Sequence, residues 1–117
     1  MKALLLDLMK VQDHCSKMGW DGYRARPIEK KSWEKARRYA ESMTAQIVPP
    51  NIGVDASTGL VSFNWGSVKG EYLSLTFDLV NDGMVQCLKR ENGVFSLCRM
   101  SETRAKGVQV RGAFYES

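Results

Sequence analysis

The stretch WDGYRARPI, residues 20–28, decides how the two halves of this chain meet. Helical patterns lie on both sides of it, and every strand-like run of residues follows it. Two large aromatic residues, Trp20 and Tyr23, flank an Asp-Gly turn, and Pro27-Ile28 leads directly into the second helical pattern. We therefore interpret residues 20–28 as a structural corner first and as a binding surface second.

Apolar side chains at three- and four-residue spacing predict one helix before the corner, over about residues 2–17, and one after it, over about 30–44. With Glu29 as the N-cap, Ile28 precedes the cap and Trp33 takes the fourth helical position, which is the arrangement of a hydrophobic staple. The carboxylate of Glu29 also suits the positive end of the helix dipole. The structural corner that we expect consists of Trp20, Asp21, Gly22, Pro27, Ile28 and Trp33.

From residue 51 onward the apolar period changes from helical to alternating, which is typical of half-buried strands. Asp82-Gly83 and Asn92-Gly93 indicate tight hairpins, because type I′ turns need positive φ at both central residues. The simplest fold is α+β, with two N-terminal helices packed on one face of a five- to six-stranded antiparallel meander sheet. The predicted strands cover about residues 51–55, 60–66, 71–80, 84–90, 94–100 and 108–115.

Two-residue turns would fix which side chains share a face of this sheet. Such a turn at Asn92-Gly93 places Leu88 opposite Leu97, and one at Asp82-Gly83 places Phe77 opposite Leu88. If the latter turn is a three-residue loop, the strand slips by one residue and the faces exchange. The two-residue version gives a helix-covered face of Leu75, Phe77, Leu88, Phe95 and Leu97, and a polar opposite face of Thr76, Asp78, Cys87, Lys89, Ser96 and Cys98.

The totals describe an ordinary globular chain. Its 117 residues predict a single domain spanning 1–117, and 44% hydrophobic with 26% charged residues is the usual balance. The net charge of +4 suits an acidic or nucleic-acid partner as well as simple solubility. Three cysteines without a C-x-x-C spacing favour a reducing compartment, and no apolar run reaches the ~20 residues of a membrane span. We therefore expect a cytoplasmic protein with no membrane contact.

The sequence offers no set of residues typical of a catalytic or cofactor site. It contains one histidine, His14, and neither a G-x-S-x-G elbow nor a phosphate-binding glycine loop. Cys87 and Cys98 come out as direct cross-strand neighbours, yet no third or fourth ligand stands near them in sequence. We therefore predict free thiols, no metal, no cofactor and no enzymatic activity.

A basic surface is the main candidate for binding. It joins the corner to the exposed side of the second helix, which we expect to carry Lys30, Lys31, Lys35, Arg37 and Arg38. Glutamates at positions 29, 34 and 41 dilute it, and Glu34 is an i,i+4 partner of both Lys30 and Arg38, so a solvated helix face is the competing interpretation. The candidate binding residues are Tyr23, Arg24, Arg26, Lys30, Lys31, Arg37 and Arg38.

The corner also resembles that of a family of small uncharacterised bacterial and phage proteins, in which it reads Asn-Trp-Asp-Gly-Tyr-Gly-Ala-x-Pro-Ile. Here Gly19 stands where Asn is usual and Arg24 where Gly is usual. The resemblance covers about residues 19–78 and implies a fold neighbourhood and a mobile-element or defence context, without an activity or catalytic residues. The matching positions are Trp20, Asp21, Gly22, Tyr23, Ala25, Pro27, Ile28, Ala36, Gly59 and Trp65.

These observations lead to three functional hypotheses. The first is a non-enzymatic protein-binding module, a phage or mobile-element inhibitor or regulator (anti-CRISPR-like or antitoxin-like) that blocks a larger partner sterically. The alternative is a nucleic-acid-binding accessory protein that uses the basic helix face. The third is an enzyme of unrecognised type.

Overall fold

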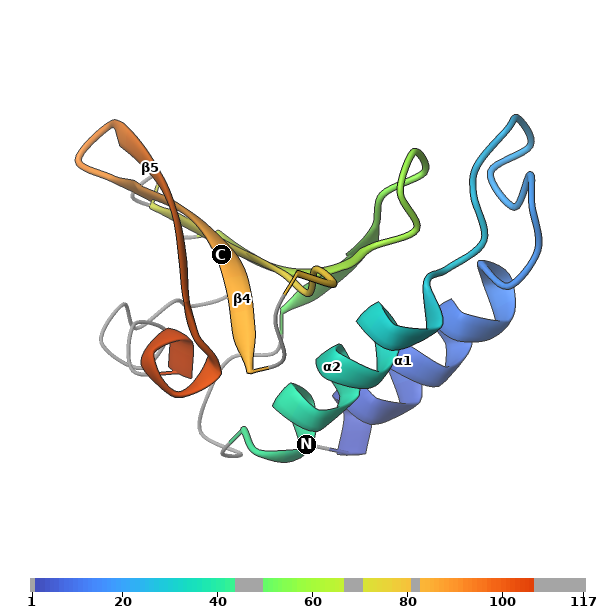
Figure 1. Cartoon of the computed structure of the whole chain (residues 1–117), viewed down its shortest axis with the longest axis horizontal. Coiled ribbons are helices and arrows are strands. Elements are labelled where there is room, and N and C mark those ends of the chain that lie inside the picture. Colours follow the sequence, from blue (N-terminus) through green and yellow to red (C-terminus); the bar gives the residue numbers. More distant parts are fainter. Residues whose placement is uncertain (1, 44–49, 67–70, 81–82, 107–117) are drawn as a thin grey trace.

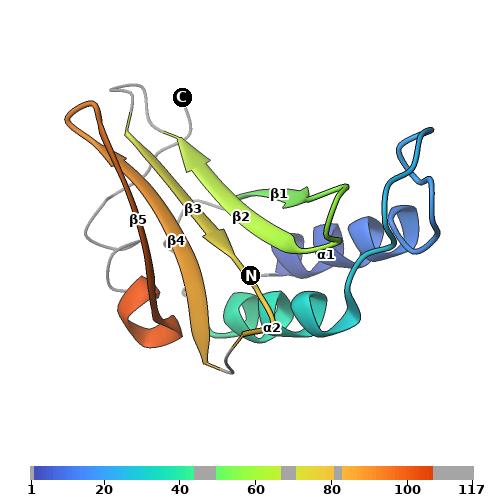
Figure 2. The ribbon, with the colours of Figure 1, turned by 45° about the horizontal axis from the view of Figure 1, so that its top comes forward.

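The computed structural model describes residues 2–43, 50–66, 71–80 and 83–106, and it confirms the α+β architecture. All strands belong to one antiparallel sheet with the order β1-β2-β3-β4-β5, a meander. The two helices lie side by side against one face of the sheet, near β1 and β2 (Figures 1 and 2). The predicted strand at 108–115 lies outside the described residues. The elements are α1 (Lys2–His14), α2 (Lys30–Glu41), β1 (Asn51–Val54), β2 (Val61–Gly66), β3 (Tyr72–Thr76), β4 (Met84–Glu91) and β5 (Val94–Ser101).

The core lies between α2 and the inner face of the sheet. Tyr39, Phe63 and Phe77 are fully buried there, and their ring centroids are 4.8 to 6.1 Å apart. Edge-on contacts between aromatic rings at such distances stabilise a core beyond the area that they bury. A short helix over residues 102–106 adds the buried Ala105 to this cluster.

The β4–β5 hairpin has the register that its turn predicts. Asn92 and Gly93 have φ of 52° and 78°, both positive, as a type I′ turn requires. Leu88 pairs with Leu97, so that prediction is confirmed.

The predicted register between β3 and β4 is wrong. Leu75 pairs with Cys87, whereas the two-residue turn at Asp82-Gly83 would have placed Phe77 opposite Leu88. The offset is an odd number of residues, so the faces of β4 and β5 are exchanged relative to the prediction. Leu88 is therefore on the outer face with Phe95 and Leu97, and Cys87 is buried on the inner face with Val85.

Two side chains of α2 explain this register. The hydroxyl of Ser32 donates to the carbonyl oxygen of Phe77 at 2.5 Å, and the ammonium of Lys35 donates to that of Asp78 at 2.6 Å. These carbonyls are therefore directed to the helix, and β3 ends at Thr76. The connection to β4 is consequently longer than a tight turn.

Both helices end earlier than predicted. α1 stops at His14 because the carbonyl of Cys15 accepts a hydrogen bond from the amide of Ile28, at 2.7 Å, and the chain turns away. α2 begins after the predicted N-cap, Glu29, and stops at Glu41 instead of residue 44.

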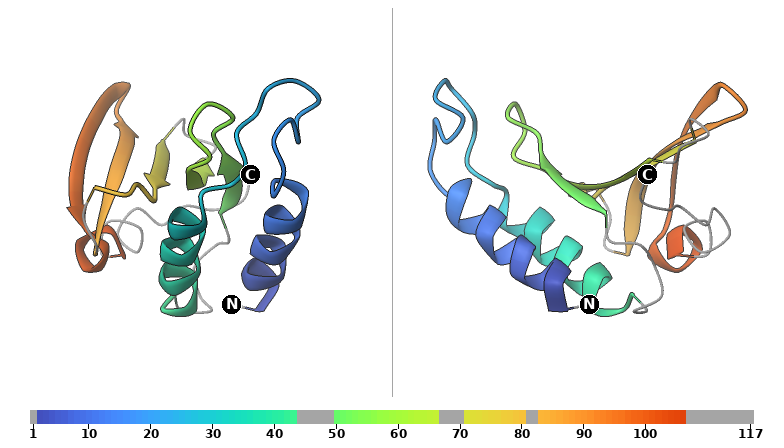
Figure 3. Two further views of the ribbon diagram at one scale, coloured as in Figure 1. Left: turned by 45° about the vertical axis from the view of Figure 1, so that its right-hand side comes forward. Right: turned by 180° about the vertical axis from the view of Figure 1, so that it is seen from behind.

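Within the corner, Asp21 accepts two backbone hydrogen bonds through Oδ1, from Tyr23 at 2.9 Å and from Ala25 at 3.2 Å. The indole of Trp20, which is half-buried, donates to the carbonyl of Arg26 at 2.7 Å. The corner also contacts the β1–β2 connection, where the amide of Glu29 donates to the carbonyl of Gly59 at 2.8 Å. Figure 3 shows the α1–α2 connection, which contains the corner, and the β1–β2 connection next to each other beyond the helix ends.

Candidate functional site

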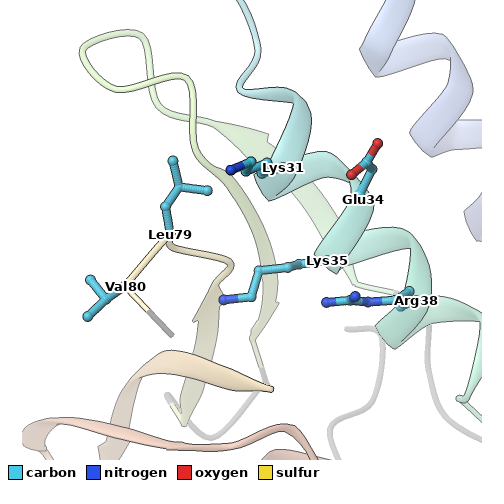
Figure 4. A pocket seen from close by; sticks show the side chains of 6 residues that line it. All are labelled: Lys31, Glu34, Lys35, Arg38, Leu79 and Val80. Atoms are coloured by element: carbon cyan, nitrogen blue, oxygen red, sulfur yellow. The ribbon is translucent and has the colours of Figure 1, made fainter. Parts of the chain in front are cut away.

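A recess of about 430 Å³ lies between α2 and the chain that leaves β3. On α2, the spacing of Lys31, Lys35 and Arg38 places these residues on one side of the helix. Figure 4 shows their cationic groups pointing toward the β3–β4 connection, while Glu34 points away. The recess is lined by Lys31, Glu34, Lys35, Arg38, Leu79 and Val80.

Lys35 holds the floor of this recess. Its side chain is only 4% exposed, and its ammonium donates to the carbonyl of Asp78 and, at 3.0 Å, to that of Met84. A buried ammonium needs such acceptors, because water no longer solvates it. Lys35 therefore joins the two ends of the β3–β4 connection to α2.

The carboxylate of Asp78 fixes the same connection from the side of the sheet. It accepts a hydrogen bond from the guanidinium of Arg99 at 2.8 Å and one from the amide of Val80 at 3.2 Å. Arg99 belongs to β5, so the residues next to the recess are tied to the far edge of the sheet. The position of Leu79 and Val80 is therefore set by contacts on both sides.

Leu79 and Val80 form an apolar rim. Their exposed fractions are 48% and 62%, although both are large aliphatic residues. Adjacent exposed aliphatic residues beside charged ones are typical of surfaces that contact other macromolecules. The recess thus combines cationic and apolar surface in one place.

The structure brings together only some of the predicted binding residues. Lys31 and Arg38 face the recess, whereas Arg37 turns to the opposite flank of α2, where its guanidinium lies 5.8 Å from the centroid of Trp33. Arg37 also forms an ion pair of 2.9 Å with Glu41. Lys30 is exposed on the first turn of α2, and Tyr23, Arg24 and Arg26 are exposed in the corner.

Sequence reasoning placed Lys35 on the exposed basic face of the second helix, whereas Lys35 is buried, and it missed Leu79 and Val80. The spacing from Lys31 through Lys35 to Arg38 was a usable signal for a shared helix face. Nothing comparable distinguished Leu79 and Val80, because Leu79 continued the alternation of the predicted strand 71–80 and Val80 was its last residue. Their exposure depends on where β3 ends, which α2 determines.

The cysteine pair has the predicted cross-strand pairing, but it lies on the inner face of the sheet and not on the predicted polar face. Cys87 and Cys98 are direct cross-strand neighbours and both are free thiols, Cys87 buried and Cys98 exposed. Burial, with a further contribution from Cys98, raises the pKa of the Cys87 thiol to about 11. The Cys87 thiol therefore stays protonated near neutral pH, which makes it a poor nucleophile and metal ligand.

Among the described residues, no group of three histidine, cysteine or acidic side chains is placed to hold a metal ion. Within the same ranges, no helix is long and apolar enough to cross a membrane. No protein-family model, curated protein or solved structure matches the chain. The resemblance of the corner motif therefore stays a prediction, and a functional argument depends on the geometry of the chain itself.

Proposed function

We propose that this domain is a non-enzymatic protein-binding module that uses the recess beside α2 to hold an acidic and apolar segment of a larger partner. It would act by steric blocking, as an inhibitor or regulator encoded by a phage or mobile element, of the anti-CRISPR or antitoxin kind. The observation that carries the proposal is the exposed pair Leu79 and Val80 next to the cationic side chains of Lys31 and Arg38.

The chemistry of the recess supports this class of partner. Aliphatic side chains on a partner can displace water from Leu79 and Val80. Carboxylates on the same segment can pair with the guanidinium and ammonium groups, and such pairs set orientation and association rate more than affinity. Because Lys35 and Arg99 hydrogen-bond to Asp78, next to Leu79 and Val80, little order has to be gained by this rim on binding.

The test compares recess variants with a matched control on the same helix. Leu79→Asp with Val80→Asp introduces two negative charges into the rim, and Arg38→Glu reverses a charge of the recess. Arg37→Glu makes the same charge change one residue away, on the flank that faces α1. Each variant, in the full chain, is used as bait for affinity capture from cells of the natural source, and its thermal midpoint is measured in parallel.

We expect a partner that binds the wild type and the Arg37→Glu variant and is lost from both recess variants at unchanged thermal midpoint. A captured partner that remains bound to both recess variants would contradict the proposal. Equal loss from the Arg37→Glu variant would show that general charge, and not the recess, mediates the contact.

Nucleic-acid binding is the second candidate, favoured by the cationic groups of Lys31 and Arg38 on one recess. Neutralising several phosphates releases counterions, so affinity for generic duplex or single strands would fall steeply with salt. Titration of both kinds of oligonucleotide at two salt concentrations distinguishes the candidates. A steep salt dependence that Arg38→Glu removes would replace the protein-binding proposal.

A further inference from the structure

No strand within the part of the chain that the structure describes pairs with the outer edge of β5. β5 is the last strand in the sheet order, and Figure 2 shows it as the outermost strand on its side of the sheet. In the hairpin closed by Glu91 and Val94, alternate residues of β5 bond to β4. The backbone N–H and C=O groups of Phe95, Leu97 and Arg99 therefore point away from β4, and no described residue pairs with them.

The side chains on this edge are unusually apolar for a strand that no described residue covers. Val94 and Leu97 are 67% and 61% exposed, and Phe95 is exposed as well. Natural proteins normally protect a free edge with proline, charge or a covering segment, because such an edge templates pairing with another strand. Leu97 also continues an apolar row on the outer face that begins at Leu88.

We propose that β5 is a self-association surface, on which two copies of this chain pair β5 to β5 antiparallel about a two-fold axis at Leu97. In this register Leu97 lies opposite Leu97 of the partner subunit, and Phe95 lies opposite the partner's Arg99. Residues 95, 97 and 99, whose backbone N–H and C=O groups point away from β4, then lie opposite residues of the same kind in the partner subunit. Their backbone groups can therefore form hydrogen bonds between the two copies. The two sheets become one continuous ten-stranded sheet.

The self-pairing is supported by complementary side chains on a single strand. The Phe95 ring already lies 5.4 Å from the guanidinium of Arg90 in the same hairpin. In the dimer, the apolar stem of the partner's Arg99 can pack on the Phe95 ring while its guanidinium stays paired with Asp78. The symmetric register keeps the two Arg99 side chains apart and joins the apolar rows from Leu88 to the partner's Leu88.

One strand added to a sheet buries less than the roughly 1,600 Å² of a standard interface, so we expect a weak, concentration-dependent dimer. Sedimentation of the full chain from low micromolar to near-millimolar concentration measures it. Leu97→Pro removes an outward N–H that β4 does not use, a change that an edge strand tolerates. We expect it to weaken dimerisation at least tenfold, and Leu97→Ala, which keeps the N–H, to weaken it less.

Cross-linking tests the register independently of Leu97→Pro and its folding. In a Cys98→Ser background, Leu97→Cys places one thiol from each copy at the axis. Val94→Cys is the matched control, because residue 94 is equally exposed but stands about 20 Å from its copy along the strands, at about 3.4 Å per residue. Diamide oxidation should give a disulfide-linked dimer with the first variant and leave the second largely monomeric.

A wild-type chain that stays monomeric at every concentration would overturn the proposal. A dimer that Leu97→Pro leaves intact, or equal cross-linking by Leu97→Cys and Val94→Cys, would do the same. β5 and the recess are separate surfaces, so the two proposals can be tested independently. A chain that does not dimerise would not contradict the proposed protein-binding function. Loss of a captured partner in the recess variants would not contradict the dimer.

Discussion

The hydroxyl of Ser32 lies at the end of the ladder between β2 and β3, where it accepts a hydrogen bond from the amide of Val61 at 2.8 Å. The same hydroxyl donates to the carbonyl of Phe77, while the Phe77 amide donates directly to the Val61 carbonyl at 2.9 Å. Of the two backbone hydrogen bonds that would join Val61 and Phe77, one is direct. The other is replaced by two hydrogen bonds through the Ser32 hydroxyl, an arrangement that we call the Ser32 relay. The end of the sheet and α2 consequently form a single hydrogen-bonded unit.

Ser32→Ala removes this relay and leaves the buried amide of Val61 without its acceptor. An unsatisfied buried group costs about 1–3 kcal/mol, so we expect the free energy of unfolding to fall by about 2–3 kcal/mol. Urea denaturation measures the change. Ser16→Ala is the control, because the Ser16 hydroxyl also donates to a backbone carbonyl, at 3.0 Å, but is exposed. Comparable losses for both variants would refute the relay.

Gly59→Ala should disconnect the β1–β2 connection from the corner. A Cβ at residue 59 would collide with the carbonyl oxygen of Pro27, and φ there is +76°. Gly22→Ala is the control, with a similar φ of +84° but open space around the added methyl. We expect about 1 kcal/mol of destabilisation for Gly22→Ala and about 3 kcal/mol or more for Gly59→Ala. Thermal unfolding that shows no difference between them would contradict the close packing.

Lys35→Met keeps the unbranched stem of the side chain and removes the ammonium that holds the carbonyls of Asp78 and Met84. Hydrogen bonds to charged groups contribute about 1.5–3 kcal/mol, so we expect a loss of about 2 kcal/mol. Amide hydrogen exchange in the β3–β4 connection should accelerate as well. Lys31→Met, one turn earlier and exposed, should change neither quantity.

The stability of the fold should decline at alkaline pH. Burial, with contributions from Glu102 and Cys87, raises the pKa of Tyr39 well above its ordinary value. Above pH of about 10 the unfolded chain loses this proton while the folded chain keeps it, so stability falls by about 1.4 kcal/mol per pH unit. The raised pKa of Cys87 acts in the same direction from a lower pH.

Tyr39→Phe removes one group that titrates differently in the folded and unfolded chains. The free energy of unfolding should therefore fall less steeply with pH, as measured by urea denaturation between mildly and strongly alkaline pH. Tyr23→Phe changes an exposed ring and should leave the decline as it is. An unchanged slope in Tyr39→Phe would show that Tyr39 titrates alike in both states.

Local signals predicted the parts of the fold that local chemistry determines. Glu29 takes the N-cap position of α2, as its place between Ile28 and Trp33 indicated, although its side chain forms no capping hydrogen bond. Asn92-Gly93 set the register of β4 and β5, because a type I′ turn leaves only one pairing. The number and order of the strands up to residue 101 followed from the alternation alone.

The remainder depended on contacts that are distant in sequence. Ser32 and Lys35 take the carbonyls of Phe77 and Asp78, 45 and 43 residues away, and this decides where β3 ends and which face of β4 is buried. The exposure of Leu79 and Val80 follows from the same contacts. The pattern of apolar residues does not reveal such pairings, so the sequence indicated Lys31 and Arg38 as candidate binding residues but not the recess that they line.

The Ser32 relay also has a consequence for the order of folding. Neighbouring strands of the meander are consecutive in sequence, so each hairpin closes only a short loop. The two bonds of Ser32 span 29 and 45 residues, and the entropy of closing a loop grows with its length. We therefore expect the hairpins to form early. α2 should dock late, when the Ser32 hydroxyl bonds to Val61 and Phe77 at the end of a β2–β3 ladder that has already formed. Helix docking would then be the step that commits the chain to its native register.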